Sequence, residues 1–198
     1  MRKLLSVAAL VLLAFAAAPG AGAQNALDAL KGALGAITGG TSTTISAGTW
    51  TYTGPGVSFK SKNALQNLGG AAAGTAIEAK LKPYYDKLGL QNMTFTVAED
   101  STYTMKVKKL TFKGKIVYGE KGECTLQMQG LGKIAGGSYK AQWQVTGNTL
   151  LLTFDITKLV AIIEKIANVS GKSSLQAVSK VLKSYDGIYA GFRFSKQK

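Results

Sequence analysis

The sequence predicts a mainly β protein, an eight-stranded antiparallel up-and-down barrel with helical insertions. Apolar and polar residues alternate with a period of two over most of residues 92–155, which is typical of strands with one buried and one solvated face. Turn residues such as Gly147-Asn148 separate the alternating runs, so consecutive strands should form hairpins. Six strands here, one around Trp50 and one at residues 188–195 give eight, a number that closes a small barrel.

Helices are expected at two places between these strands. The first, over residues 61–89, follows the strand around Trp50 and carries a stripe of mostly small residues. Such a stripe suits either a mobile lid or a helix packed closely on the barrel, and we favour the packed helix because glycine within a helix often has a packing reason. A pair of helices is expected at residues 156–170 and 173–185, directly before the last strand, since apolar residues recur there at helical spacing.

Residues 1–23 have the features of a cleaved secretory signal. Arg2 and Lys3 precede an apolar run, which closes on small residues that end at Ala23. The run is shorter than the roughly 20 residues that span a bilayer, so we expect cleavage after Ala23 and no integral membrane segment afterwards. No cysteine stands just after the expected cleavage site, so a lipoprotein is not expected. The sequence therefore predicts an exported protein, in the periplasm or outside the cell.

The rest of the chain is expected to form one domain. Residues 24–47 should hold a short amphipathic helix and a linker, and residues 48–198 the barrel domain. Cys124 is the single cysteine, so an internal disulfide is excluded and the domain must be stable through its core alone. We expect this domain to be a monomer.

The composition excludes most catalytic and metal-binding arrangements. The chain has no histidine and one cysteine, which rules out Ser-His-Asp and Cys-His machinery and the usual zinc sites. Glu99 and Asp100 are adjacent carboxylates, but they fall in an expected turn, where aspartate bonds its own backbone. We therefore expect no enzymatic activity, no metal and no cofactor.

The formal net charge of +14 comes almost entirely from lysine, because Arg2 and Arg193 are the two arginines. Proteins that read nucleic acids rely on the bidentate contacts of arginine, so no nucleic-acid partner is expected. Lysines on the polar face of strands keep a sheet soluble and discourage edge pairing. Attraction to an acidic partner stays open.

Gly48-Thr49-Trp50 resembles the Gly-x-Trp of the first strand of lipocalins and their relatives. A basic residue of the last strand crosses that tryptophan in the superfamily, so the resemblance pairs Trp50 with Arg193 at a closed barrel end, the guanidinium on the indole face. Residues 95–128 are also similar to an uncharacterised family of exported lipocalin-like bacterial proteins, with a calycin-type barrel. The helix pair before the last strand departs from ordinary lipocalins.

Two functions remain open at this point. The first is a carrier that binds a small hydrophobic molecule in the barrel, where methionines suit an adaptable pocket. The second is a structural or interaction module of the cell envelope, with a packed barrel and a basic outer surface that binds an acidic partner. The interior residues that would line a pocket are Phe95, Tyr103, Met105, Phe112, Leu126, Met128, Trp143 and Phe154.

Overall fold

The computed structural model describes residues 44–60, 71–120, 122–167, 172–185 and 187–197. The signal peptide expected at residues 1–23, and the short helix expected after it, lie outside the described residues. Within the described part, the candidate interior residues and both ends of the barrel are present, so the fold around them can be followed in full.

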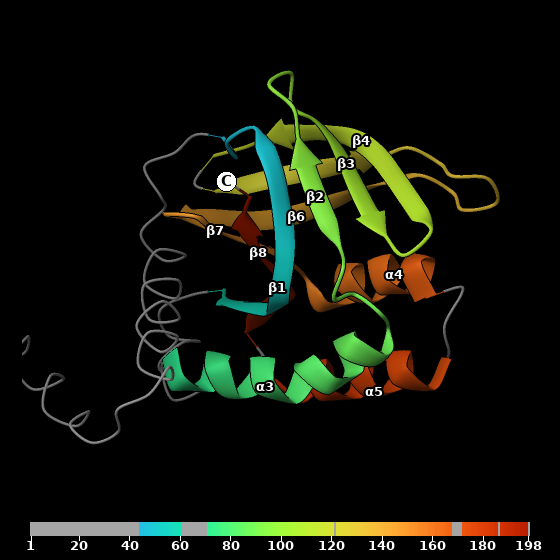
Figure 1. Cartoon of the computed structure of the whole chain (residues 1–198). Helices are drawn as coiled ribbons and strands as arrows, with labels where there is room; N and C mark the ends of the chain where they lie inside the picture. The colour runs from blue at the N-terminus through green and yellow to red at the C-terminus, as the bar shows by residue number, and fades with distance from the viewer. Residues whose placement is uncertain (1–43, 61–70, 121, 168–171, 186, 198) are drawn as a thin grey trace, which may run out of the picture.

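Eight antiparallel strands close a barrel in sequence order, with the first strand paired to the last (Figure 1). This confirms the predicted eight-stranded up-and-down barrel. The strands are β1 (Gly48–Phe59), β2 (Thr94–Val97), β3 (Thr102–Val107), β4 (Leu110–Tyr118), β5 (Glu123–Met128), β6 (Gly137–Thr146), β7 (Thr149–Phe154) and β8 (Ile188–Lys196). Buried and more exposed residues alternate along β2, β3 and β5, as a barrel with one packed face requires.

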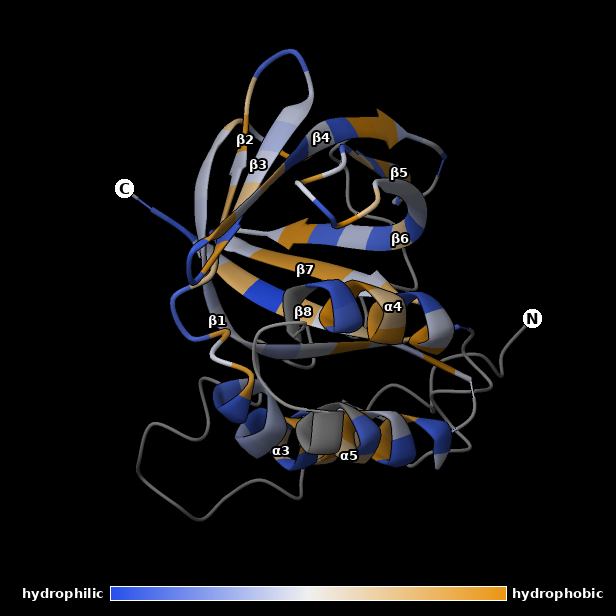
Figure 2. Cartoon of the chain, turned by 90° about the vertical axis from the view of Figure 1, so that its right-hand side faces the viewer, coloured by the Kyte–Doolittle hydropathy of each residue, from blue (hydrophilic) through white to orange (hydrophobic). Residues whose placement is uncertain are grey.

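The described helices lie at the predicted places in the strand order: α3 (Ala71–Lys87) lies between β1 and β2, and α4 (Ile156–Ala167) and α5 (Lys172–Lys183) precede β8. Residues 61–70, the first part of the helix predicted over 61–89, lie outside the described residues. In Figure 1, α3 and α5 run side by side below the barrel, and α4 packs on α5 and on strands β7 and β8. Figure 2 shows apolar and polar residues together along α4 and α5, the pattern of helices with one buried side. The helical layer therefore covers one side of the barrel.

The first strand changes partners along its length. Residues Gly48 to Thr51 of β1 pair with β2, whereas Trp50 to Phe59 pair with β8, with a register shift between Tyr52 and Gly54. Beyond this shift the edge of β1 that faces away from β8 is covered by α3, which packs on β1. A covered edge is protected from pairing with another chain.

Trp50 is fully buried. Its indole Nε1 donates a hydrogen bond to the Ser46 carbonyl oxygen at 3.2 Å. Lys196 of β8 is the strand partner of Trp50, and its Nζ lies 5.5 Å from the centroid of the Trp50 ring. Gly48 has a φ of +133°, and a Cβ there would lie 3.0 Å from Lys196 Cε. The glycine of the Gly-x-Trp sequence thus leaves room for the lysine that crosses the tryptophan.

The predicted contact between Trp50 and Arg193 is wrong. Arg193 pairs in register with Gly54, and its Nη2 donates to Glu78 Oε1 of α3 at 2.6 Å. The reason is the alternation of β8: the rings on either side of Arg193 are buried in the core, which turns the guanidinium to the opposite face of the strand. The basic residue over the indole is therefore Lys196.

Replacing Trp50 by alanine should lower the free energy of unfolding by about 3–5 kcal/mol, because a fully buried indole leaves a large cavity. Chemical denaturation followed by far-ultraviolet circular dichroism measures this change. Val117→Ala is the control, since Val117 is 44% exposed and its truncation should change stability by less than about 0.5 kcal/mol. Equal, small effects of both substitutions would contradict the role of Trp50 as a core anchor.

Candidate functional site

The structure places all eight predicted interior residues in one buried hydrophobic core. They come from six consecutive strands, because inward positions recur at every second residue. The eight are Phe95 on β2, Tyr103 and Met105 on β3, Phe112 on β4, Leu126 and Met128 on β5, Trp143 on β6, and Phe154 on β7. Their exposed fractions divide them into two groups.

Phe95, Phe112 and Phe154 form the sealed group, with exposed fractions of 0–1%. The Phe95 ring lies 5.8 Å from Phe194, and the Phe154 ring lies 6.2 Å from Phe192. Both partners are inward residues of β8, so aromatic rings fill the part of the barrel beside its last strand. This part resembles an ordinary packed core.

The other group keeps a small exposure and lies on β3, β5 and β6. Leu126, Trp143, Met105 and Met128 are 6–8% exposed. Tyr139 is 8% exposed and is the strand partner of Leu126, so it joins this group although the sequence argument did not select it. Its alternation with Trp143 on one face of β6 was the available signal. We call these residues, with Tyr103, the β3–β6 cluster.

Trp143 carries an unpaired polar atom in this cluster. Its Nε1 is buried and has no hydrogen-bond partner among the described residues, in contrast to the bonded indole of Trp50. The Tyr118 ring packs edge-on against the Trp143 ring at 5.7 Å, and the Tyr118 hydroxyl accepts a bond from the Ile45 amide at 3.2 Å. An unpaired buried donor costs about 1–3 kcal/mol, and a ligand with an acceptor atom would remove that cost.

The titratable groups beside the cluster are held in their neutral forms. Burial raises the pKa of the Tyr103 hydroxyl well above its ordinary value, and the nearby Tyr139 and Cys124 raise it further. Burial also raises the pKa of the Cys124 thiol to about 12. The Tyr103 hydroxyl and the Cys124 thiol are therefore uncharged at neutral pH, which favours an uncharged, apolar molecule beside them. A positive charge borders the cluster at Tyr139, where Lys165 Nζ lies 5.9 Å from the ring centroid.

A second polar group lies where α3 meets the seam of β1 and β8. Glu78 Oε1 accepts hydrogen bonds from Arg193 Nη2 at 2.6 Å and from the Val57 amide at 2.9 Å. Burial raises the pKa of the Glu78 carboxyl, an effect that outweighs the lowering by Arg193 and by Val57. The hydroxyls of Tyr52 and Tyr85 are buried and unpaired among the described residues, and burial raises the pKa of both. The carboxylate thus joins the helix to the barrel seam.

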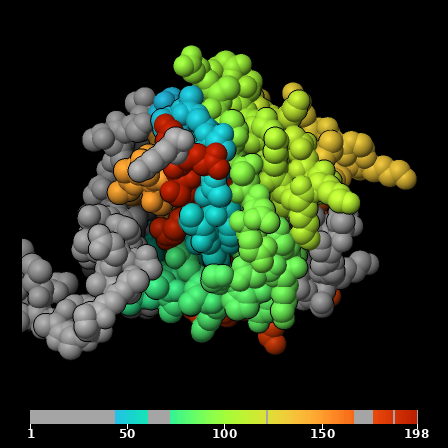
Figure 3. Space-filling model, viewed as in Figure 1, coloured from blue at the N-terminus to red at the C-terminus, as the bar shows by residue number. Residues whose placement is uncertain are grey.

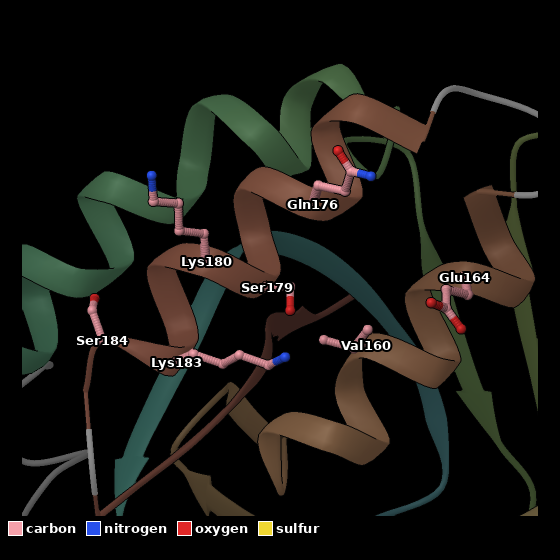
Figure 4. Close-up of a pocket in the computed structure, with 7 residues that line it drawn as sticks. All are labelled: Val160, Glu164, Gln176, Ser179, Lys180, Lys183 and Ser184. Atoms are coloured by element: carbon pink, nitrogen blue, oxygen red, sulfur yellow. The ribbon is translucent and has the colours of Figure 1, made fainter.

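A surface groove of about 600 Å³ lies between α4 and α5. Figure 4 shows Lys183 reaching across the space between the two helices toward Val160. The groove is lined mainly by polar side chains at the molecular surface: Val160, Glu164, Gln176, Ser179, Lys180, Lys183 and Ser184. This groove is open to solvent, so it would leave much of a bound apolar ligand exposed.

A second groove, of about 420 Å³, runs beside β5 and β6 and contains two carboxylates, Glu123 and Asp155. Both are already engaged. Glu123 accepts a bond from Gln142 Nε2 at 3.2 Å, and Asp155 accepts one from the Thr157 amide at 3.0 Å at the start of α4. Asp155 also pairs with Lys60 at 3.4 Å. These carboxylates serve the fold, and their bonds give no support to a paired acid and base.

Two further features concern only the described residues. Within them, no three His, Cys, Asp or Glu side chains gather closely enough to hold a metal ion. No helix in the same part of the chain is long and apolar enough to cross a membrane.

Comparisons with known proteins concern the fold and the family. A family model described as a lipocalin-like domain (DUF4923) matches residues 23–196. The crystal structure of a DUF4847 family protein from Bacteroides vulgatus is similar at 13% sequence identity and a TM-score of 0.36, over 77% of this chain and 95% of that chain. No curated protein matches the chain.

Replacing Arg193 by glutamine should destabilise the protein by about 1.5–3 kcal/mol near neutral pH, because Glu78 loses its charged hydrogen-bond partner. The loss of Arg193 also raises the pKa of Glu78 further. In acid, below the ordinary pKa of 4.5, Glu78 is protonated in folded and unfolded chains, so the difference between variant and wild type should shrink as the pH falls.

Denaturant unfolding across this pH range measures the effect. The matched control is the double variant Glu78→Gln/Arg193→Gln, which lacks the carboxylate. Its stability difference from wild type should not follow the pH profile of the single variant. A penalty for Arg193→Gln that is independent of pH would contradict the assigned pairing.

Proposed function

The chain belongs to the lipocalin-like domain family DUF4923, and from this premise we propose that its barrel carries a small, mainly apolar molecule held against the β3–β6 cluster. Membership of this family identifies a barrel domain but does not identify a ligand. The proposal rests instead on the interior of this particular barrel, in which one part is sealed by aromatic rings and the other keeps residual exposure.

The unpaired Nε1 of Trp143 is the observation that carries the proposal. A donor buried without a partner is uncommon in native proteins and calls for an explanation. The methionines of the cluster, Met105 and Met128, are flexible and polarizable, so they adapt to the shape of a guest. A ligand that is apolar over most of its surface and carries one acceptor, such as a carbonyl oxygen, complements this lining.

The proposed carrier acts without chemical change to its ligand and outside the cytoplasm. The neutral Cys124 thiol, with its pKa of about 12, is a poor nucleophile because thiolate is the reactive form. Export is inferred from the signal-like pattern that ends at Ala23. We retain the expectation of a monomer that takes up its ligand without metal or cofactor.

A second candidate function is a structural or interaction module of the envelope whose barrel is filled by its own side chains. The aromatic packing around Phe192 favours it, since this ring meets Tyr52, Tyr85 and Phe154 at centroid distances of 5.9–6.4 Å. Eight-stranded barrels occur both filled and with a small ligand. The two candidates differ in whether a molecule binds inside.

Native mass spectrometry of the protein purified from its own cells separates the two candidates. A carrier should show a discrete bound mass that is lost on denaturation. A mass of the bare protein alone, unchanged after incubation with a lipid extract of the same cells, would contradict the carrier and favour the filled module.

The Trp143 donor can be tested with two probes, an apolar fluorescent naphthyl ketone and the matching naphthalene without the carbonyl. Trp143→Phe should weaken binding of the ketone by roughly 2- to 10-fold, the worth of one net hydrogen bond, and weaken binding of the hydrocarbon less. Fluorescence titration of both probes measures the difference.

Tyr118→Phe is the matched control, because its hydroxyl lies on a ring that packs on Trp143 but already accepts a bond from Ile45. This variant should bind both probes with unchanged preference. Equal weakening of both probes by Trp143→Phe would show that the indole contributes shape and not a hydrogen bond.

A further inference from the structure

The hairpin of β3 and β4 carries a concentration of positive charge. Residues 102–118 contain five lysines and no aspartate or glutamate. All five are exposed, and four of them are called here the lysine face: Lys106, Lys109, Lys113 and Lys115. The fifth, Lys108, lies in the turn with its side chain folded over Gly89, so it is left out of the face.

The register of the hairpin spreads these cations over its outer side. Lys106 is the partner of Thr111, and Lys113 is the partner of Thr104, so no two lysines stand directly opposite each other. Direct opposition of like charges would destabilise the sheet. Figure 3 shows the green and yellow-green elements β2 to β4 lying open on the visible side of the molecule. The lysines are therefore dispersed and accessible.

The lysine face lacks neutralising partners of its own. The ion pairs of the described residues join Lys60 to Asp155, Lys82 to Asp86 and Arg193 to Glu78, and all three lie on other elements. Asp100, at the turn before β3, is hydrogen-bonded by Thr102, which lowers its pKa, and the charge of Lys115 is a smaller influence on it. The positive field of the hairpin is thus directed to solvent.

The positive charges of this face come from lysine, and lysine favours a particular class of partner. Lysine is a strongly hydrated point charge without the fork geometry of arginine, so an array of lysines recognises a field of negative charge and not a particular group. Anionic lipid headgroups provide such a field, and each lysine near them adds to the attraction. Val117 follows Lys113 and Lys115 on the outward side of β4 and is 44% exposed, which adds an apolar contact at a bilayer interface.

We propose that the lysine face docks the protein peripherally on anionic phospholipid bilayers. The barrel interior takes no part in this contact, so the proposal is independent of a bound ligand. The partner is the membrane surface itself, met by the outer side of the β3–β4 hairpin.

Co-sedimentation with vesicles tests this directly. The full chain should bind vesicles of phosphatidylcholine with about 30% phosphatidylserine and not vesicles of phosphatidylcholine alone, at about 0.1 M salt. Binding should fall at least tenfold at about 1 M salt, because the Debye length shrinks from about 10 Å to about 3 Å. Lys106→Gln/Lys109→Gln/Lys113→Gln should weaken binding at about 0.1 M salt by at least tenfold.

The control removes the same charge elsewhere. Lys87→Gln/Lys158→Gln/Lys183→Gln changes one exposed lysine in each of α3, α4 and α5, and it should bind anionic vesicles within about twofold of wild type. Equal weakening by both triple variants, at unchanged melting temperature, would overturn the proposal in favour of unlocalised net charge. Binding to an acidic polysaccharide but not to anionic vesicles would also overturn it.

Discussion

Closure of the barrel depends on β1, which must pair with β2 at one end and with β8 along most of its length. The register shift after Tyr52 follows the part of β1 that pairs with β2 and opens the part that pairs with β8 alone. Beyond it, Glu78 of α3 bonds the Val57 amide and Arg193 of β8 together, so one carboxylate joins helix, first strand and last strand. A buried charge of this kind is stable only while its partners stay in place. The helical layer and the barrel seam are therefore expected to lose their structure together.

The two sides of the barrel interior are packed in different ways. Beside β8, edge-on and tilted aromatic pairs such as Phe192 with Phe194 and Phe95 with Phe194 fill the space, and such pairs add stability beyond the area they bury. Across the barrel, the β3–β6 cluster combines flexible methionines with an unpaired indole donor. In the proposed carrier, the aromatic side would keep the shape of the barrel while the methionine side adapts to the ligand.

Alternation along the strands was sufficient to predict the barrel and the buried place of Trp50, and helical spacing was sufficient to predict the helices, because period and turn chemistry are local properties. The partner of Trp50 was not predictable in the same way. The alternation of β8 already places Arg193 on the face opposite Phe192 and Phe194. Choosing Lys196 in its place, however, requires the register of two strands that are far apart in the sequence, and that register shifts within β1. The bond to Glu78 is equally remote in sequence. Tyr139 could have been predicted as an interior residue, because it lies on the same face of β6 as Trp143. The local sequence does not show, however, which interior residues keep some exposure and which are fully buried.

The seam between β1 and β8 also affects the order in which the barrel forms. The Thr53 hydroxyl bonds the Arg193 carbonyl oxygen at 3.2 Å across 140 residues of sequence, and such distant contacts cost loop-closure entropy before they stabilise anything. In the sequence, β8 comes after every other described strand, so β1 and β7 keep unpaired edges until β8 pairs with them. Open edges of this kind invite pairing with other chains. Pairing of β8, and not formation of any single hairpin, is therefore the step that removes these edges and with them the risk of aggregation.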